Sequence, residues 1–199
     1  MMTVDAARLR VLYAPGTWAD PSWLAHYGIS DGWPPRLRNA LLLRRAGARP
    51  VTVTDLSSPA AEWLAAHWEV LPKAVYVAGA RLARDVLISR NMLLRLRHDA
   101  ARFTAMLAAV PSWDARLDGP AYANLRGCDA HGLAFAAGMQ CLFGAWPEVG
   151  PGWRDRLRLR LPIEAMPAGL SPAGPPLPGA MACRRLLDNA MMFCHAQNH

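Results

Sequence analysis

Lysine and glutamate are scarce in this chain of 199 residues. Lys73 is the only lysine among 22 basic residues, and four of the 15 acidic residues are glutamates. Basic residues still prevail, with a formal net charge of +7 and a pI of about 9.9. This balance favours an acidic partner, which can be nucleic acid, anionic lipid or a protein surface. Coding bias alone also produces such an excess of arginine over lysine, so the charge does not choose among these partners.

The sequence also lacks the short motifs of catalysis and of metal or nucleotide binding. It contains no Cys-x-x-Cys, H-E-x-x-H, G-x-S-x-G, Walker A or G-x-G-x-x-G pattern. Its four cysteines lack companions at zinc-ligand spacing and are predicted to be free thiols: Cys128, Cys141, Cys183 and Cys194. The sequence leaves open a catalytic pair of a nucleophile and a histidine that only the fold brings together. We expect no enzyme, with no catalytic residues, no cofactor and no metal ion.

No segment has the pattern of a signal peptide or a membrane span. Residues 1–10 contain Asp5 and no apolar run. The longest apolar stretch, 132–146, contains Gln140 and is shorter than the roughly 20 residues that a span needs. We therefore expect a cytosolic protein without direct membrane insertion.

The pattern of apolar residues predicts helices. Hydrophobic residues make up 53% of the chain, enough for a core. They recur every three or four positions over 71–86 and 93–110, which places them on one helix face. Capping residues, prolines and apolar runs predict further helices at 36–46, 59–70, 129–146 and 180–195. Gly132, Gly138 and Gly144 would weaken helix 129–146, and we expect them where neighbouring helices approach closely.

One arginine-rich segment, 153–162, is ambiguous between helix and strand. Its apolar residues at every fourth position fit one face of a helix, but Leu157–Leu161 alternates leucine with arginine as a strand does. We favour a helical turn that runs into a strand. Leu9–Tyr13 alternates similarly, so the two segments are predicted to pair as a small two-stranded β element.

The predicted fold is mainly α, with bundled or orthogonally packed helices in one domain over residues 1–199. We divide it into a tryptophan-rich N-terminal segment, a helical core, a loop with six prolines and three glycines, and a C-terminal helix. These parts are expected at 1–58, 59–161, 162–179 and 180–195.

Four arginines at alternate positions form the densest basic cluster: Arg154, Arg156, Arg158 and Arg160. They are candidates for a docking face toward an acidic partner, and they could also contact phosphates. A third interpretation is that Arg156 and Arg160 only brace the local fold by pairing with an acidic residue or with carbonyl groups.

The alternative function is a basic helical DNA-binding regulator. Four tryptophans could be base-stacking platforms, although tryptophan near loops more often covers a core edge or anchors a protein interface: Trp18, Trp23, Trp33 and Trp153. A helix-turn-helix needs a short turn, often with glycine, before an exposed recognition helix. The 89–91 junction lacks that glycine, so we favour a protein without a nucleic-acid partner.

The order of several short motifs resembles the YscK/PscK/OrgA (SctK-like) family, the K-component of the type III secretion sorting platform. Leu9-Arg10 followed by Ala14-Pro15 is similar to that family's N-terminal segment, and 71–106 lies where the family has its central helices. The motif residues are Gly132, Leu133 and Phe135, then Trp153, Arg156, Leu157, Leu159, Arg160, Leu161 and Pro162. Residues 17–58 resemble the family poorly.

The resemblance implies a specific role. Members are helical adaptors at the cytoplasmic face of the inner membrane, beneath the ring of the injectisome. They link the cytoplasmic domain of the ring D-component to the pod protein, the Q-component, which connects through the stator to the ATPase. No catalytic residue or cofactor belongs to the family, so none is implied for this chain.

Overall fold

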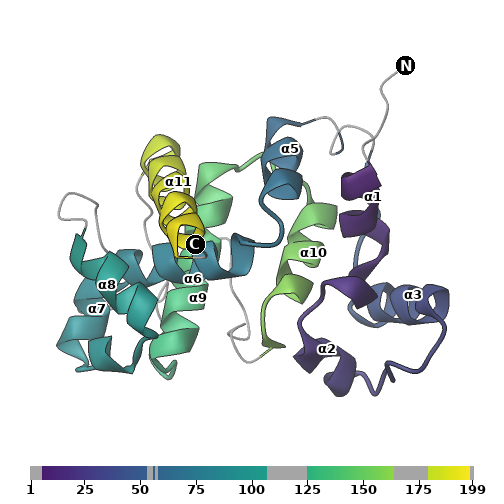
Figure 1. Ribbon diagram of the computed structural model, residues 1–199, viewed down its shortest axis with the longest axis horizontal. Coiled ribbons are helices and arrows are strands. Elements are labelled where there is room, and N and C mark those ends of the chain that lie inside the picture. The colour runs from purple at the N-terminus through teal and green to yellow at the C-terminus, as the bar shows by residue number, and fades with distance from the viewer. Residues whose placement is uncertain (1–5, 53–55, 57, 107–124, 164–178, 198–199) are drawn as a thin grey trace. The chain divides into compact units, whose positions relative to one another are not determined.

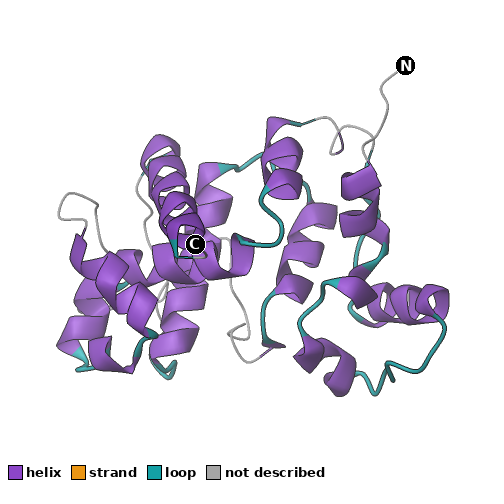
Figure 2. Cartoon of the chain, in the orientation of Figure 1, coloured by secondary structure: helices purple, strands orange, loops and turns teal. Residues whose placement is uncertain are grey.

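The computed structural model describes residues 6–52, 56, 58–106, 125–163 and 179–197. Every regular element in these ranges is a helix, which confirms the mainly α prediction (Figures 1 and 2). The chain divides into two compact units: unit 1 comprises 1–69 and 148–163, and unit 2 comprises 70–147 and 164–199. The single domain over 1–199 stays a prediction, and most of the proline-rich loop lies outside the described residues.

Unit 1 is built from short helices that begin at prolines or capping residues. Asp20 accepts a hydrogen bond from the Ser22 amide, and Ser58 accepts one from the Ala61 amide. Gly47, in the left-handed region at φ +62°, follows the third α-helix as predicted. The described helices of unit 1 are α1 (Ala6–Tyr13), the 3-10 helix η1 (Pro15–Thr17), α2 (Pro21–His26), α3 (Pro35–Arg45), α5 (Pro59–Ala66) and α10 (Pro151–Arg160).

The predicted two-stranded β element is wrong. Leu9–Tyr13 belongs to α1, and Leu157–Leu161 continues α10 up to its C-terminal cap. The alternation of leucine and arginine predicted a strand with the leucines on its buried face and every arginine in water. Arg156 is buried instead, as are Leu157 and Leu159, so α10 is covered on several sides at once.

Unit 2 is a set of helices packed around the pair α6 and α9. Helix α11 packs against both, and α8 packs against α6. The predicted stripe on α6 is buried, and the predicted helix at 93–110 begins as the 3-10 helix η2 before α8. Within the part of unit 2 that the structure describes, the helices are α6 (Leu71–Leu82), α7 (Arg84–Ser89), η2 (Leu93–Arg95), α8 (His98–Met106), α9 (Ala130–Ala145) and α11 (Ala180–Ala196).

Two glycines set the approach of α6 to α9. A Cβ atom on Gly79 of α6 would overlap the carbonyl oxygen of Ala134, and one on Gly138 of α9 would overlap that of Val75. The obstacles are backbone atoms, so they cannot rotate away. This agrees with the expectation that Gly138 lies where a neighbouring helix comes close.

The cysteines of unit 2 predict a simple pattern of thiol reactivity. Cys141, Cys183 and Cys194 are buried and Cys128 is half-buried, all as free thiols. Burial raises the pKa of Cys194 to about 11 and also raises the pKa of Cys128. We expect an aromatic disulfide reagent at pH 7 to label Cys128 slowly in the native protein and all four thiols in urea. Rapid labelling of two or more native thiols would contradict this packing.

Candidate functional site

Helix α10, which carries the candidate arginines, fills the middle of unit 1. Its first turn begins at Pro151, whose missing amide proton costs nothing there. Gly152 is buried, and a Cβ atom on it would lie 2.8 Å from the carbonyl oxygen of Pro50. Trp153 follows with 1% of its surface exposed. The sequence therefore places α10 against the segment that follows α3.

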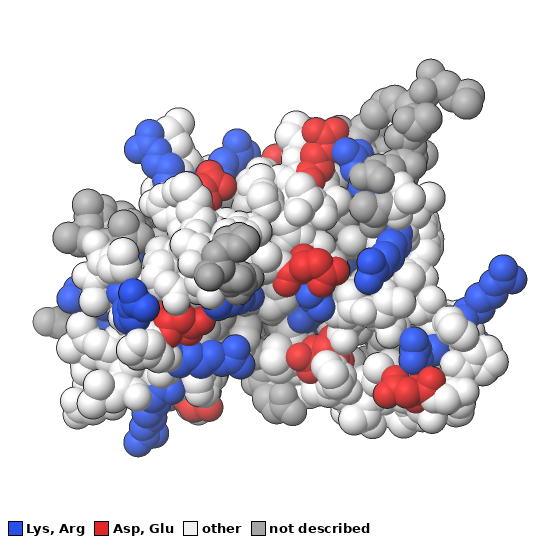
Figure 3. Space-filling model, in the orientation of Figure 1, with Lys and Arg blue, Asp and Glu red and all other residues white. Residues whose placement is uncertain are grey.

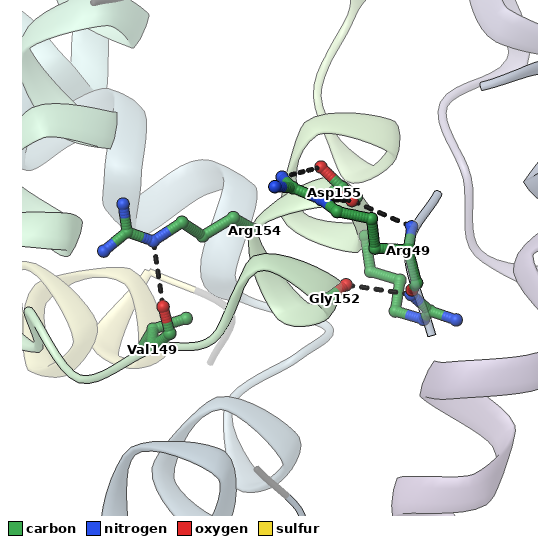
Figure 4. A network of polar contacts seen from close by, with 6 residues as sticks. Arg49, Val149, Gly152, Arg154 and Asp155 are labelled. Atoms are coloured by element: carbon green, nitrogen blue, oxygen red, sulfur yellow. Dashed lines mark hydrogen bonds and ion pairs between the residues drawn. The ribbon is translucent and has the colours of Figure 1, made fainter. Parts of the chain in front are cut away.

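Arg156 is a buried cross-link of the main chain, with 2% of its surface exposed. Its Nε donates to the carbonyl oxygen of Leu12 at 2.9 Å. Its Nη1 donates to the carbonyl oxygens of Arg49 and Gly152, which Figure 4 labels, at 2.8 and 2.9 Å. Leu12 lies in the last turn of α1, where carbonyl groups lack helical partners, so Arg156 caps that helix. Burial lowers the pKa of Arg156, but a guanidinium stays charged.

Arg160 performs a similar task at the C-terminal end of α10. Its Nη1 donates to the carbonyl oxygen of Trp18 at 2.5 Å, and its Nη2 pairs with the Glu69 carboxylate at 3.0 Å. Its Nε reaches the Trp68 carbonyl oxygen at 3.4 Å. The contacts of Arg156 and Arg160 favour the interpretation that both brace the fold through carbonyl groups.

The remaining two arginines of the cluster differ from each other. Arg154 is half-buried and donates from Nε to the Val149 carbonyl oxygen at 2.9 Å (Figure 4). Arg158 is exposed. The four arginines are thus brought onto one helix but do not form one continuous basic face. A docking role for the cluster stays a prediction, and Arg158 is its most accessible member.

Sequence reasoning missed the ion pair between Arg49 and Asp155. Asp155 is 9% exposed and accepts from the Arg49 amide, Nε and Nη2 at 2.9, 2.8 and 2.9 Å (Figure 4). Burial by itself would raise the pKa of Asp155, but hydrogen bonds and charge from Arg49, with the charge of Arg158, hold that pKa below its usual value. An aspartate between arginines in an arginine-rich segment was the available signal.

This ion pair predicts a pH-dependent contribution to stability. The folded-state pKa of Asp155 lies below the ordinary value of about 3.9, so its stabilising effect is complete above that value and is lost as the pH falls through the folded-state pKa. Urea unfolding should show Asp155→Asn less stable than the wild type at pH 6, with the difference shrinking at pH 3. A difference that is constant from pH 6 to pH 3 would exclude this role.

Three of the four highlighted tryptophans are not surface groups. Trp18, Trp23 and Trp153 expose 4, 8 and 1% of their surface, whereas Trp33 exposes 36%. Trp18 and Trp68 meet edge to face with ring centroids 5.0 Å apart, and the Trp23 Nε1 donates to the Leu161 carbonyl oxygen at 2.8 Å. Base stacking by these three tryptophans is therefore excluded by their burial, which fits tryptophan that covers a core.

The other motif residues are also parts of the two cores. In α9, Leu133 is fully buried, and Phe135 packs on Tyr76 with ring centroids 4.9 Å apart. The amide of Gly132 donates at 2.7 Å to Asp129, the N-terminal cap. In unit 1, Leu157, Leu159 and Leu161 are buried, and Pro162 is half-buried. These positions are therefore explained by packing.

The histidine, cysteine and carboxylate side chains of the described residues form no group of three that could hold a metal ion. Nor is any described helix both long and apolar enough to cross a membrane. On the face drawn in Figure 3, acidic side chains are interspersed with basic ones.

Comparison with known families agrees with the resemblance carried by the motifs. The model of the family described as bacterial type III secretion apparatus protein (OrgA_MxiK) matches residues 8–197. Neither a curated protein nor a solved structure matches the chain. The matched range includes residues of both units and every motif residue of α9 and α10. The chain therefore belongs to the OrgA_MxiK family of bacterial type III secretion apparatus proteins.

Proposed function

We propose that this apparatus protein is a non-enzymatic adaptor of the sorting platform, linking the ring D-component to the pod Q-component. It would act in the cytoplasm, at the inner face of the inner membrane, and reach the stator and the ATPase only through the pod protein. The observation that carries the proposal is the family match over residues 8–197.

The division of side chains between buried cores and the exposed surface supports an adaptor. The two units have separate cores, of which α10 is central to one and the pair α6 and α9 to the other. Buried arginines of α10 are engaged with carbonyl groups, and the four thiols lie at buried or half-buried positions. Exposed arginine and apolar side chains are left for partner contacts, as is typical of interface hot spots.

Pairwise binding tests the proposal. The purified chain should bind the purified cytoplasmic domain of the D-component and the purified pod protein of the same secretion system in separate titrations. If Arg158 contributes to either contact, Arg158→Glu should weaken that binding, whereas unfolding stability should change by no more than about 0.5 kcal/mol. Binding to neither protein would overturn the proposal.

A DNA titration separates the adaptor from the regulator. Nucleic-acid binding through several phosphate contacts would appear as retardation of duplex DNA at low salt that disappears steeply as salt rises. We expect no retardation at low salt. Salt-sensitive retardation together with failure to bind either apparatus protein would favour the regulator instead.

A further inference from the structure

The most exposed apolar side chain of the described residues lies on the η2 turn of unit 2. Leu94 has 96% of its surface exposed, compared with 68% for Met181, the next large apolar residue. Arg95 and Arg97, which flank it closely in sequence, are exposed too. Single exposed apolar residues are common on protein surfaces, so the exposure of Leu94 matters here because it coincides with an ordered turn and with exposed arginines.

The backbone holds this turn in a defined conformation. Helix α7 and its C-cap Arg90 are followed by Asn91, which lies in the left-handed region at φ 55°. The Asn91 amide donates to Ile88 O at 3.0 Å, and the Met92 amide donates to Leu87 O at 2.8 Å. These two bonds form the Schellman motif that terminates helices. Leu96, two residues after Leu94, is buried and anchors the other end. Leu94 is therefore presented outward by a preformed turn, which lowers the entropic cost of binding.

The surroundings of the turn are basic. Segment 84–106 contains five arginines and two aspartates. Both aspartates already have cationic partners, since Asp85 lies 3.6 Å from Arg84 and Asp99 lies 3.6 Å from Lys73. Figure 3 shows several basic side chains, with fewer acidic ones among them, over the part of the molecule where Figure 1 places α7 and α8.

The two arginines beside Leu94 are available in different ways. Arg95 has no polar partner among the described residues. The guanidinium carbon of Arg97 lies 5.3 Å from the centre of the Tyr76 ring, a cation–π contact that fixes the side chain but leaves it exposed. A cation fixed on an aromatic ring and a second exposed cation, both within three residues of a projecting leucine, complement an apolar pocket with an acidic rim.

We propose that Leu94, Arg95 and Arg97 form a docking surface, the Leu94 surface, for an acidic protein whose apolar pocket receives Leu94. A phosphate backbone would use the arginines but gives a leucine no pocket, and one leucine on a short turn is a small anchor for a bilayer. The inference rests on the proposed function, because it takes the partner to be one of the two apparatus proteins named above.

Titrations with the D-component domain and with the pod protein as probes test the Leu94 surface. Leu94→Glu should raise the Kd for one of the two proteins about tenfold or more and leave the other unchanged. The matched control is Met181→Glu, an exposed apolar residue on α11 of the same unit, which should leave both unchanged. If the wild type binds but Leu94→Glu binds both proteins equally well, only the Leu94 surface is overturned. If the wild type binds neither, the proposed function fails and the inference fails with it.

A charge reversal tests the acidic rim. Arg95→Glu should weaken the same complex and reduce its dependence on salt, whereas Arg185→Glu, an exposed arginine on α11, should change neither. An unchanged salt dependence with Arg95→Glu would overturn the acidic partner. Vesicles containing phosphatidylglycerol test a membrane as the partner. If the wild type binds these vesicles, and Leu94→Glu abolishes that binding but leaves both protein complexes unaffected, the surface binds lipid and the proposal is overturned.

Discussion

Gly138→Ala should destabilise unit 2 by about 3 kcal/mol, although alanine is the better helix former. In an exposed helix the same change stabilises by about 1 kcal/mol. Here the added methyl group would overlap the backbone of Val75, so α6 and α9 must separate and lose packing along their length. Urea unfolding followed by circular dichroism measures the change.

The reciprocal contact provides a second variant at the same crossing. Gly79→Ala should cost a similar amount, since its methyl group would overlap the carbonyl oxygen of Ala134. Gly127→Ala is the control, because nothing lies within 4 Å of the position of its Cβ, and it should stay within about 0.5 kcal/mol of the wild type. Stabilisation by Gly138→Ala would show that the helices do not approach as described.

Arg156→Met should cost unit 1 about 2 to 4 kcal/mol, which makes it the largest expected effect in the arginine cluster. Methionine fills part of the volume but donates no hydrogen bond. The carbonyl groups of Leu12 and Arg49 would then be left without the donor that reaches them from α10. Because these carbonyl groups belong to separate segments, the loss would loosen α1 and the segment after α3 together.

Arg158→Met is the matched control for this prediction. It lies on the same helix and makes the same chemical change, but its side chain is exposed. We expect a change of no more than about 0.5 kcal/mol in unfolding free energy. Equal losses for Arg156→Met and Arg158→Met would contradict the assignment of Arg156 as an internal brace.

Local chemistry made much of the fold predictable from sequence. Asp20 and Ser58 cap helices because their side-chain oxygens accept amide protons within three residues, and Gly47 follows a helix because it adopts a positive φ easily. The stripe on α6 was visible because helix spacing alone decides which residues share a face.

The arginines of α10 show where such reasoning stops. Whether Arg156 faces water depends on the carbonyl groups of Leu12 and Arg49, which lie more than 100 residues away along the chain. Rules based on the spacing of nearby residues cannot predict contacts at such separations. The same limit hid the partnership of Arg49 with Asp155. Strand-like alternation was therefore misleading at 157–161, and sequence alone did not decide whether Trp18 and Trp23 are buried, as they are in the structure.

The family supplied what local chemistry did not. The motifs in α9 and α10 carried the resemblance, yet in the structure they are mostly core and bracing residues. Because most of these side chains are buried, we look for partner-contacting surfaces among the exposed residues. Leu94 and its neighbours were not singled out by any motif, because full exposure of one leucine is visible only in three dimensions.

Formation of a ternary complex tests the adaptor most directly. The D-component domain, this chain and the pod protein should be mixed and examined by size-exclusion chromatography with light scattering. We predict one species that contains all three proteins and that does not form between the D-component domain and the pod protein when this chain is left out. Mutually exclusive binding of the two partners, or a complex that forms equally well without this chain, would contradict the account.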